Sequence, residues 1–117
     1  CSSDLIACFT DNIYETIETM RKQGVQFLDT PNAYYDVIDA RVPNHGEDVA
    51  RMKQNKILID ADQETKKKLL LQIFTQNAVG PIFFEIIQRK GNTGFGEGNF
   101  QALFESIERE QMRRGVL

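Results

Sequence analysis

Two hydrophobic runs separated by a short linker dominate the second half of the chain. Residues 69–75 read LLLQIFT and residues 81–90 read PIFFEIIQRK, and both are rich in residues that favour extended structure. Residues 76–80 between them are few enough to form a tight connection. The pattern therefore predicts an antiparallel β-hairpin over residues 69–90.

One charged residue interrupts the second run at its centre. Glu85 stands between two apolar residues, and strand alternation places it on the same face as Phe83. Gln72 and Phe74 share a face on the first run, so a second polar group can point into the same cavity. A buried carboxylate needs a cation, a donor network or a metal. A water-facing glutamate on an edge strand is the alternative interpretation.

The first third of the chain predicts a strand, a helix and a second strand. Residues 5–9 form a short apolar run typical of a strand. Asn12 offers a side-chain oxygen for a helix N-cap, with Glu15 three residues later, and Gly24 can end the helix in the left-handed conformation. Residues 25–28 predict the next strand. The apolar face of the helix consists of Ile13, Ile17 and Met20.

The middle of the chain predicts shorter elements. Pro31 marks the start of a helical segment, residues 47–53 predict another short helix, and residues 56–60 predict a strand. We interpret the three lysines at 66–68 as a solvated turn, because no glycine-rich loop accompanies them as a phosphate site would require.

A glycine-rich loop at residues 91–98 leads into the last predicted helix, residues 100–113, with Asn99 as its expected N-cap. The loop lacks the GxGxxG order of nucleotide loops, and Glu97 would repel phosphate, so nucleotide binding is disfavoured. The expected apolar face of the helix comprises Phe100, Leu103, Phe104 and Ile107.

Composition is that of an ordinary soluble domain. The chain has 117 residues, 41% hydrophobic and 26% charged, which indicates one domain or part of one. A net charge of -3 with scattered basic residues gives little support for nucleic-acid binding. No apolar run approaches the roughly 18 residues of a membrane span, and we identify no signal peptide. Two cysteines close in sequence fit a reducing, cytoplasmic location.

The chain offers few residues for classical catalysis. Its one histidine, His45, lies in a polar break and is interpreted as a surface residue. No serine or cysteine can be paired with this single base on sequence grounds. The residues alone therefore predict a soluble α+β domain with an unusual carboxylate, Glu85, on an inner strand.

Longer blocks of sequence carry a family resemblance. Residues 80–117, beginning GPIFFEIIQRKGNTGFGEGNFQALFESIE, closely resemble the C-terminal end of bacterial 4-hydroxyphenylpyruvate dioxygenases, and the similarity continues in LLLQIFT and in residues 9–35. The resemblance implies the vicinal-oxygen-chelate fold, in which βαβββ modules pair into an open barrel around one metal. Residues 6–90 would be one such module, half of the barrel, and residues 91–117 the glycine-rich loop and C-terminal lid helix.

The resemblance also implies an activity. Enzymes of this family use Fe(II) and dioxygen for oxidative decarboxylation and ring hydroxylation of 4-hydroxyphenylpyruvate, which gives homogentisate in tyrosine and phenylalanine catabolism. Two histidines and one glutamate hold the iron, and Glu85 matches that glutamate. We expect a homo-oligomer for the full enzyme. The substrate contacts carry over to Gln72, Phe74, Phe83, Phe95, Asn99 and Phe100.

The sequence departs from the family pattern at its front. Leu5 stands where the family has a histidine ligand, and the other histidine belongs to a preceding module that is absent here. Only one of three ligands remains, so we predict that this polypeptide alone is not an active dioxygenase. The half-barrel would leave its concave apolar face uncovered, which predicts self-association.

The first five residues have an unusual origin in this interpretation. CSSDL is the translation of TGCTCTTCCGATCT, the end of a common sequencing adapter, followed by any base. We therefore expect residues 1–5 to be a non-native tail and the natural sequence to continue upstream. A natural linker of small polar residues is the alternative, and sequencing the locus across this junction distinguishes the two.

Two other functions remain open. 4-Hydroxymandelate synthase shares the fold, iron and substrate but hydroxylates the side chain. Phe95 favours the ring-hydroxylating enzymes, which prefer phenylalanine at this lid position. A metal-free vicinal-oxygen-chelate binding module that has lost its histidines is the alternative of a different class. An intact histidine-bearing module upstream would exclude it.

Overall fold

The computed structural model describes residues 4–77 and 80–115, and its α+β architecture is built on one mixed four-stranded sheet. The strands are β1 (Asp4–Phe9), β2 (Leu58–Ala61), β3 (Leu69–Phe74) and β4 (Ile82–Lys90). Their order is β1-β4-β3-β2, with β1 parallel to β4 and the other neighbours antiparallel. The predicted α+β class and the hairpin of β3 and β4 are confirmed.

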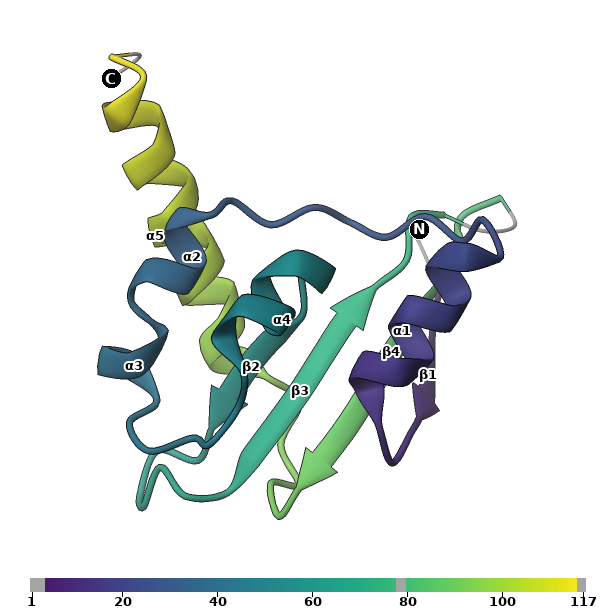
Figure 1. The fold of residues 1–117 in the computed structure, drawn as a ribbon, viewed down its shortest axis with the longest axis horizontal. Helices are drawn as coiled ribbons and strands as arrows, with labels where there is room; N and C mark the ends of the chain where they lie inside the picture. The colour runs from purple at the N-terminus through teal and green to yellow at the C-terminus, as the bar shows by residue number, and fades with distance from the viewer. Residues whose placement is uncertain (1–3, 78–79, 116–117) are drawn as a thin grey trace.

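Five helices accompany this sheet in the described chain (Figure 1). They are α1 (Ile13–Lys22), α2 (Ala33–Asp36), α3 (Ile38–Arg41), α4 (Val49–Asn55) and α5 (Glu97–Arg113). In Figure 1, α1 and α4 lie across one face of the sheet, while α2 and α3 lie beyond the β2 edge. The hydrophobic core therefore lies between one sheet face and these helices, and the opposite face is left for other contacts.

The N-terminal helix forms where its capping residues predict. The Asn12 side chain accepts a hydrogen bond from the Glu15 backbone at 3.2 Å, and Ile13 and Ile17 are fully buried. The Ile13 N–H also donates to Gln88 Oε1 at 2.9 Å, which fixes the start of α1 against β4. The cap and the apolar spacing are thus confirmed.

The predicted strand at residues 25–28 is wrong. Phe27 makes only an isolated bridge to Thr75, and the Leu28 N–H donates to the Phe74 carbonyl at 2.9 Å. The antiparallel partner β2 occupies the edge of β3 only as far as Gln72. The segment therefore reaches just the end of β3 that extends past β2, which is too little for a regular strand.

Side chains close the outer edge of β2. The Tyr34 hydroxyl accepts from the Ile59 N–H at 2.9 Å, and Arg41 Nη2 donates to the Ile59 carbonyl at 2.8 Å. The Tyr35 hydroxyl donates to the Ile57 carbonyl at 3.1 Å. These bonds satisfy backbone groups that an edge strand would otherwise leave open for pairing with another chain.

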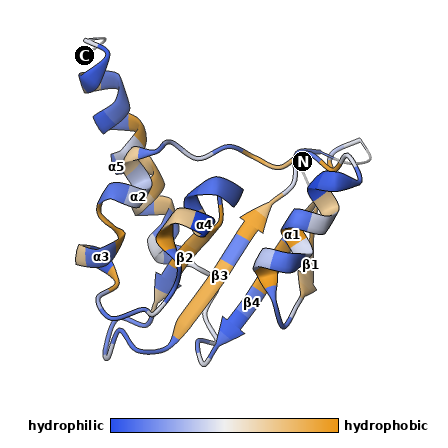
Figure 2. Ribbon diagram, in the orientation of Figure 1, coloured by the Kyte–Doolittle hydropathy of each residue, from blue (hydrophilic) through white to orange (hydrophobic). Residues whose placement is uncertain are grey.

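The two faces of the β3–β4 hairpin differ in character. Leu71, Ile73 and Ile86 point into the core beneath the helices. We call the opposite side the site face, and on it lie Gln72, Phe74, Phe83, Glu85 and Arg89, as the pairing of Gln72 with Ile87 and of Phe74 with Glu85 requires. Figure 2 shows that most of β3 is hydrophobic, because both of its faces are covered.

The last helix begins earlier than predicted. Gly96, with a φ of 78°, is the N-cap, and α5 starts at Glu97. Asn99 therefore lies inside the first turn, with 2% of its surface exposed, and the prediction that it caps the helix is wrong. Its side chain points toward the sheet instead of toward its own backbone.

The apolar stripe predicted for this helix is largely exposed. The helix residues that are buried are Asn99, Ala102 and Ser106. Phe100, Phe104 and Ile107 are 67%, 59% and 47% exposed. The spacing correctly identifies residues on one side of a helix, but it does not tell which side the rest of the chain covers.

The opposite edge of the sheet is open. Leu5, Ile6 and Phe9 of β1 are 49%, 45% and 71% exposed, and the strand pairs only with β4 in the described chain. This edge and the exposed phenylalanines of α5 give the molecule apolar surface that nothing in the described residues covers.

Two surface predictions have different outcomes. The lysines at 66–68 lie in an exposed turn, as predicted, with Asp62 accepting backbone hydrogen bonds from Lys67 and Lys68. The interpretation of His45 as a surface residue is wrong, because its side chain is only 7% exposed. His45 Nε2 contacts Asp39 and Nδ1 accepts from the Glu47 N–H, so both ring nitrogens have local partners.

Candidate functional site

Glu85 is the buried acid of the site face. It lies in the middle of β4, beside Phe74 of β3 and Ala7 of β1, and is 7% exposed. Gln72 Nε2 donates to Glu85 Oε2 at 2.5 Å. Burial raises the pKa of Glu85, while the Gln72 hydrogen bond and the charge of Arg89 act in the opposite direction. The carboxylate is therefore held in place without a direct cationic partner among the described residues.

A chain of amides continues from this carboxylate into α5. Gln72 is 1% exposed, and its Oε1 accepts from Asn99 Nδ2 at 2.7 Å. The contact between Gln72 and Glu85 agrees with the prediction that Gln72 of β3 lies on the same side of the hairpin as Glu85. Asn99 reaches Gln72 because α5 begins beside the sheet, and Gly96 permits that approach. A Cβ on Gly96 would overlap the Gln72 side chain.

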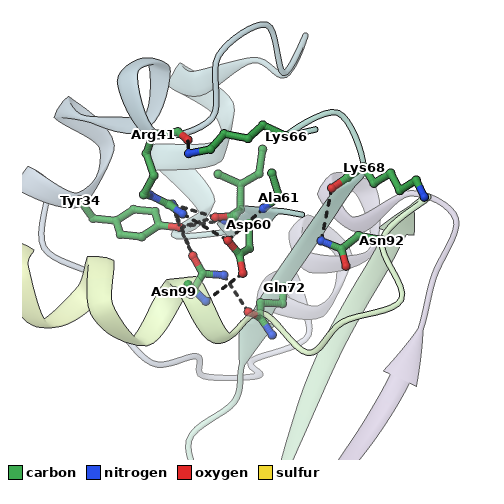
Figure 3. A network of polar contacts seen from close by, with 11 residues as sticks. Tyr34, Arg41, Asp60, Ala61, Lys66, Lys68, Gln72, Asn92 and Asn99 are labelled. Carbon is green, nitrogen blue, oxygen red and sulfur yellow. Dashed lines mark hydrogen bonds and ion pairs between the residues drawn. The ribbon is translucent and has the colours of Figure 1, made fainter. Parts of the chain in front are cut away.

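The amides connect to a tyrosine and an arginine (Figure 3). The Tyr34 hydroxyl lies 2.5 Å from Asn99 Oδ1, and Arg41 Nη2 donates to Tyr34 at 2.8 Å. Arg41 Nη1 lies 3.6 Å from Asp60 Oδ1, and Asp60 Oδ2 accepts from the Gly98 N–H at 2.9 Å. The first turn of α5 is thus bound to β2 and β3 through buried polar groups.

Sequence reasoning missed this second half of the network. Tyr34 and Arg41 occupy separate short helices, and Asp60 lies in a strand, so no local spacing relates them. The available signal was Gly98, since a glycine within a helix costs stability and here a Cβ would clash with Asp60. Such a glycine indicates that another group approaches the helix closely.

Two predicted site phenylalanines lie beside the carboxylate. Phe74 pairs directly with Glu85, and Phe83 precedes Glu85 by two residues on the same face. The rings of Phe74 and Phe83 have centroids 6.3 Å apart and are tilted by 59°. They form an apolar wall on one side of the acid, suited to an aromatic group.

The other two predicted phenylalanines are not brought to this wall. Phe95 is 73% exposed, and the Arg89 guanidinium lies 5.9 Å from its ring centroid. Phe100 is 67% exposed on the outer side of α5. The structure thus gathers Gln72, Phe74, Phe83, Glu85 and Asn99, and leaves Phe95 and Phe100 largely exposed.

The strand beside β4 carries the position at which a ligand histidine is expected. Leu5 of β1 pairs with Phe83, and Ala7 pairs with Glu85. Leu5 and Glu85 therefore project from the same sheet face on adjacent strands, one residue pair apart. Within residues 4–77 and 80–115, no group of three or more His, Cys, Asp or Glu side chains is placed to hold a metal.

Comparison with known proteins identifies close relatives. No protein-family model matches the chain. It is 61% identical to a 4-hydroxyphenylpyruvate dioxygenase of Legionella pneumophila, over 96% of this chain and 32% of the relative. It is 61% identical to hemolysin VllY of Vibrio vulnificus and 55% identical to a 4-hydroxyphenylpyruvate dioxygenase of Pseudomonas aeruginosa, in each case over 96% of this chain and 31% of the relative. The chain spans about a third of the length of these relatives.

Solved structures agree in fold. A mutant of 4-hydroxymandelate synthase from Streptomyces coelicolor matches with a TM-score of 0.71 and 36% identity, over 92% of this chain and 30% of that one. A xylose isomerase-like TIM barrel/4-hydroxyphenylpyruvate dioxygenase fusion protein matches with a TM-score of 0.74 and 30% identity, over 89% and 17%. The fold is that of a vicinal-oxygen-chelate domain. None of the described helices has the length and apolar character needed to cross a bilayer.

Proposed function

We propose that this chain is the C-terminal part of the catalytic domain of a bacterial 4-hydroxyphenylpyruvate dioxygenase, because it is closely similar to such enzymes over about a third of their length. The whole protein would convert 4-hydroxyphenylpyruvate and dioxygen to homogentisate with Fe(II). The observation that carries the proposal is the buried Glu85, which faces the same side of the sheet as position 5 on the next strand.

Glu85 fits a metal ligand by its surroundings. Its pKa is raised by burial, and it has one amide donor but no ion pair among the described residues, so a bound cation would relieve the cost of its charge. A histidine at position 5 would project from the same sheet face on the adjacent strand, diagonally from Glu85, and a second histidine would come from the preceding module. Fe(II) in such a facial triad supplies open positions for substrate and dioxygen.

The remaining site residues would hold the substrate. Phe74 and Phe83 offer an apolar wall for an aromatic ring, and Gln72 and Asn99 are buried amides whose positions are fixed by hydrogen bonds. We propose that the exposed Phe95 and Phe100 complete the pocket as parts of a lid over the aromatic ring. Their apolar side chains would exclude water from the reacting centre.

The 117-residue chain by itself would be inactive. Leu5 has no group that binds a metal, and one carboxylate is too few ligands to hold Fe(II) firmly. Extension upstream by the missing module, together with Leu5→His, should therefore generate both iron binding and activity. We propose that the active enzyme is a cytoplasmic homo-oligomer.

The test compares this chain with the extended Leu5→His protein. We expect Fe(II)-dependent formation of homogentisate by the extended protein only, and its loss in Glu85→Ala. Glu105→Ala, which removes an exposed carboxylate of α5, should leave product formation unchanged. Titration with Fe(II) in the absence of oxygen should show iron binding by the extended protein and by Glu105→Ala, and its loss in Glu85→Ala. A folded extended protein that binds no iron and gives no product would overturn the proposal.

One alternative activity has support. The structural match to a 4-hydroxymandelate synthase mutant is consistent with side-chain hydroxylation of the same substrate. Product analysis in the same assay separates the two, because the synthase would release 4-hydroxymandelate in place of homogentisate. Absence of both products and of iron binding would instead favour a metal-free binding module.

A further inference from the structure

The buried hydrogen bonds of the site run in one direction, from Arg41 to Glu85. Arg41 donates to Tyr34, Tyr34 to Asn99, Asn99 to Gln72, and Gln72 to Glu85, at 2.8, 2.5, 2.7 and 2.5 Å. We propose that Tyr34 and Arg41 are positioning residues that fix the orientation of the Gln72 amide toward Glu85. The catalytic consequence of this relay rests on the proposed function, but the orientation itself does not.

The direction of this relay of hydrogen bonds is set at the Tyr34 hydroxyl. The hydroxyl oxygen accepts from Arg41 Nη2 and from the Ile59 N–H, which occupies both of its lone pairs. The Ile59 carbonyl, 3.1 Å from the hydroxyl, is a competing acceptor that also accepts from Arg41 Nη2 at 2.8 Å. A hydroxyl has one proton, and the 2.5 Å contact to Asn99 Oδ1 is the shorter of its two possible bonds. Because a guanidinium and a backbone N–H cannot accept, this polarity cannot reverse.

The proton on Tyr34 determines how both amides lie. Asn99 Oδ1 faces the hydroxyl and also lies 3.5 Å from Arg41 Nη2, so Asn99 Nδ2 faces Gln72 Oε1. Gln72 must then present Nε2, its donor, to Glu85. A reversed amide at either position would place an oxygen against the carboxylate or against another oxygen. The relay therefore ensures that the carboxylate meets a hydrogen-bond donor.

Burial makes this arrangement difficult to replace. Tyr34, Gln72 and Asn99 are 0%, 1% and 2% exposed, so solvent cannot readily substitute for a missing partner. Gly96 holds the helix start so close to Gln72 that no side chain fits between them. A change at Tyr34 should thus be transmitted to Gln72 instead of being absorbed by water.

The chain offers a matched control for the test. Tyr34→Phe removes the hydroxyl that orders the relay, whereas Tyr35→Phe removes a neighbouring buried hydroxyl that donates to the Ile57 carbonyl and takes no part in the relay. We would record the side-chain amide NMR signals of Gln72 and Asn99 and their hydrogen exchange in both variants. Exchange in Tyr34→Phe should be about five to ten times faster, as for the loss of one hydrogen bond, with altered amide shifts. Tyr35→Phe should leave both signals as in the parent chain.

Two further measurements complete the test. If Tyr34→Phe does not fold, Arg41→Lys replaces it, since lysine lacks the two separate nitrogens with which Arg41 reaches Tyr34 and Ile59 on one side and Asp60 on the other. Unchanged Gln72 and Asn99 signals in a folded Tyr34→Phe or Arg41→Lys variant, or equal changes in Tyr35→Phe, would overturn the relay.

In the extended Leu5→His protein, Tyr34→Phe should lower kcat/KM about tenfold and Tyr35→Phe less than twofold. Altered amides with equal kcat/KM would refute the catalytic consequence, while inactivity of every variant, the parent included, would refute only the proposed function.

Discussion

Two carboxylates of the sheet are buried almost equally, yet their surroundings differ. Asp60 is 6% exposed, lies 3.6 Å from an Arg41 nitrogen and accepts from the backbone N–H groups of Ala61 and Gly98. Glu85 is 7% exposed and accepts one side-chain hydrogen bond, from Gln72. The described chain satisfies the first acid with a cation and two backbone donors, and gives the second a single amide.

The contrast separates a structural acid from a candidate ligand. Asp60 joins the start of α5 to β2, and its charge is compensated within the chain. Glu85 keeps a raised pKa, which means that the fold bears the cost of its ionisation. A group retained at such a cost is a functional candidate, because burial without compensation does not contribute to stability.

The largest expected effect comes from Gly96→Ala. Its φ of 78° is unfavourable for alanine, and the new Cβ would overlap Gln72. We expect a loss of about 3 kcal/mol in the free energy of unfolding, measured by urea denaturation. Gly24→Ala is the control, since it has a positive φ but nothing within 4 Å of its Cβ, and it should lose only about 1 kcal/mol. Equal losses in the two variants would contradict the close packing of α5 on Gln72.

Asp60→Ala should have the next largest effect. The Gly98 N–H would lose its acceptor, and the partly buried Arg41 would lose its ionic partner. We expect a destabilisation of about 2 kcal/mol in the same denaturation assay. Asp60→Asn, which keeps one acceptor oxygen, should cost about half as much. A change below about 0.5 kcal/mol in both variants would remove the distinction between the two acids.

Glu85→Gln should act in the opposite direction and should depend on pH. The folded protein has the higher Glu85 pKa, so the favourable contribution of the protonated acid is complete below the unfolded value of about 4.3 and is lost as pH rises through the folded pKa. We expect Glu85→Gln to resemble the parent near pH 4 and to be more stable by about 1 kcal/mol at pH 7. Denaturation at several pH values measures the difference, and a destabilised variant at pH 7 would show that the ionised acid is well compensated.

The smallest expected effect concerns association. The exposed apolar edge of β1 should promote self-association of the chain, and Phe9→Ser should shift the distribution toward monomer in sedimentation velocity. Met112→Ser, which removes an equally apolar but distant exposed residue near the end of α5, should have less effect. A parent chain that sediments as a single monomeric species would contradict the prediction.

The sequence determined those features that depend on local chemistry. The cap at Asn12, the burial of Ile13 and Ile17 in α1 and the alternation of the β3–β4 hairpin follow from neighbouring residues and were predicted correctly. The unusual carboxylate at Glu85 was visible as well, because a charge in the centre of an apolar strand conflicts with its surroundings. The resemblance then related that carboxylate to a family of enzymes.

Tertiary structure alone decided which surfaces meet. Residues 25–28 have a strand-like sequence, but β2 leaves them only the end of β3. Asparagine is a residue type that favours helix caps, yet the Asn99 side chain forms hydrogen bonds with Gln72 and Tyr34 instead. Hydrogen bonds between residues far apart in sequence leave no periodic signal, so the connection of Tyr34 to Glu85 exists only once helices, loop and sheet are folded together.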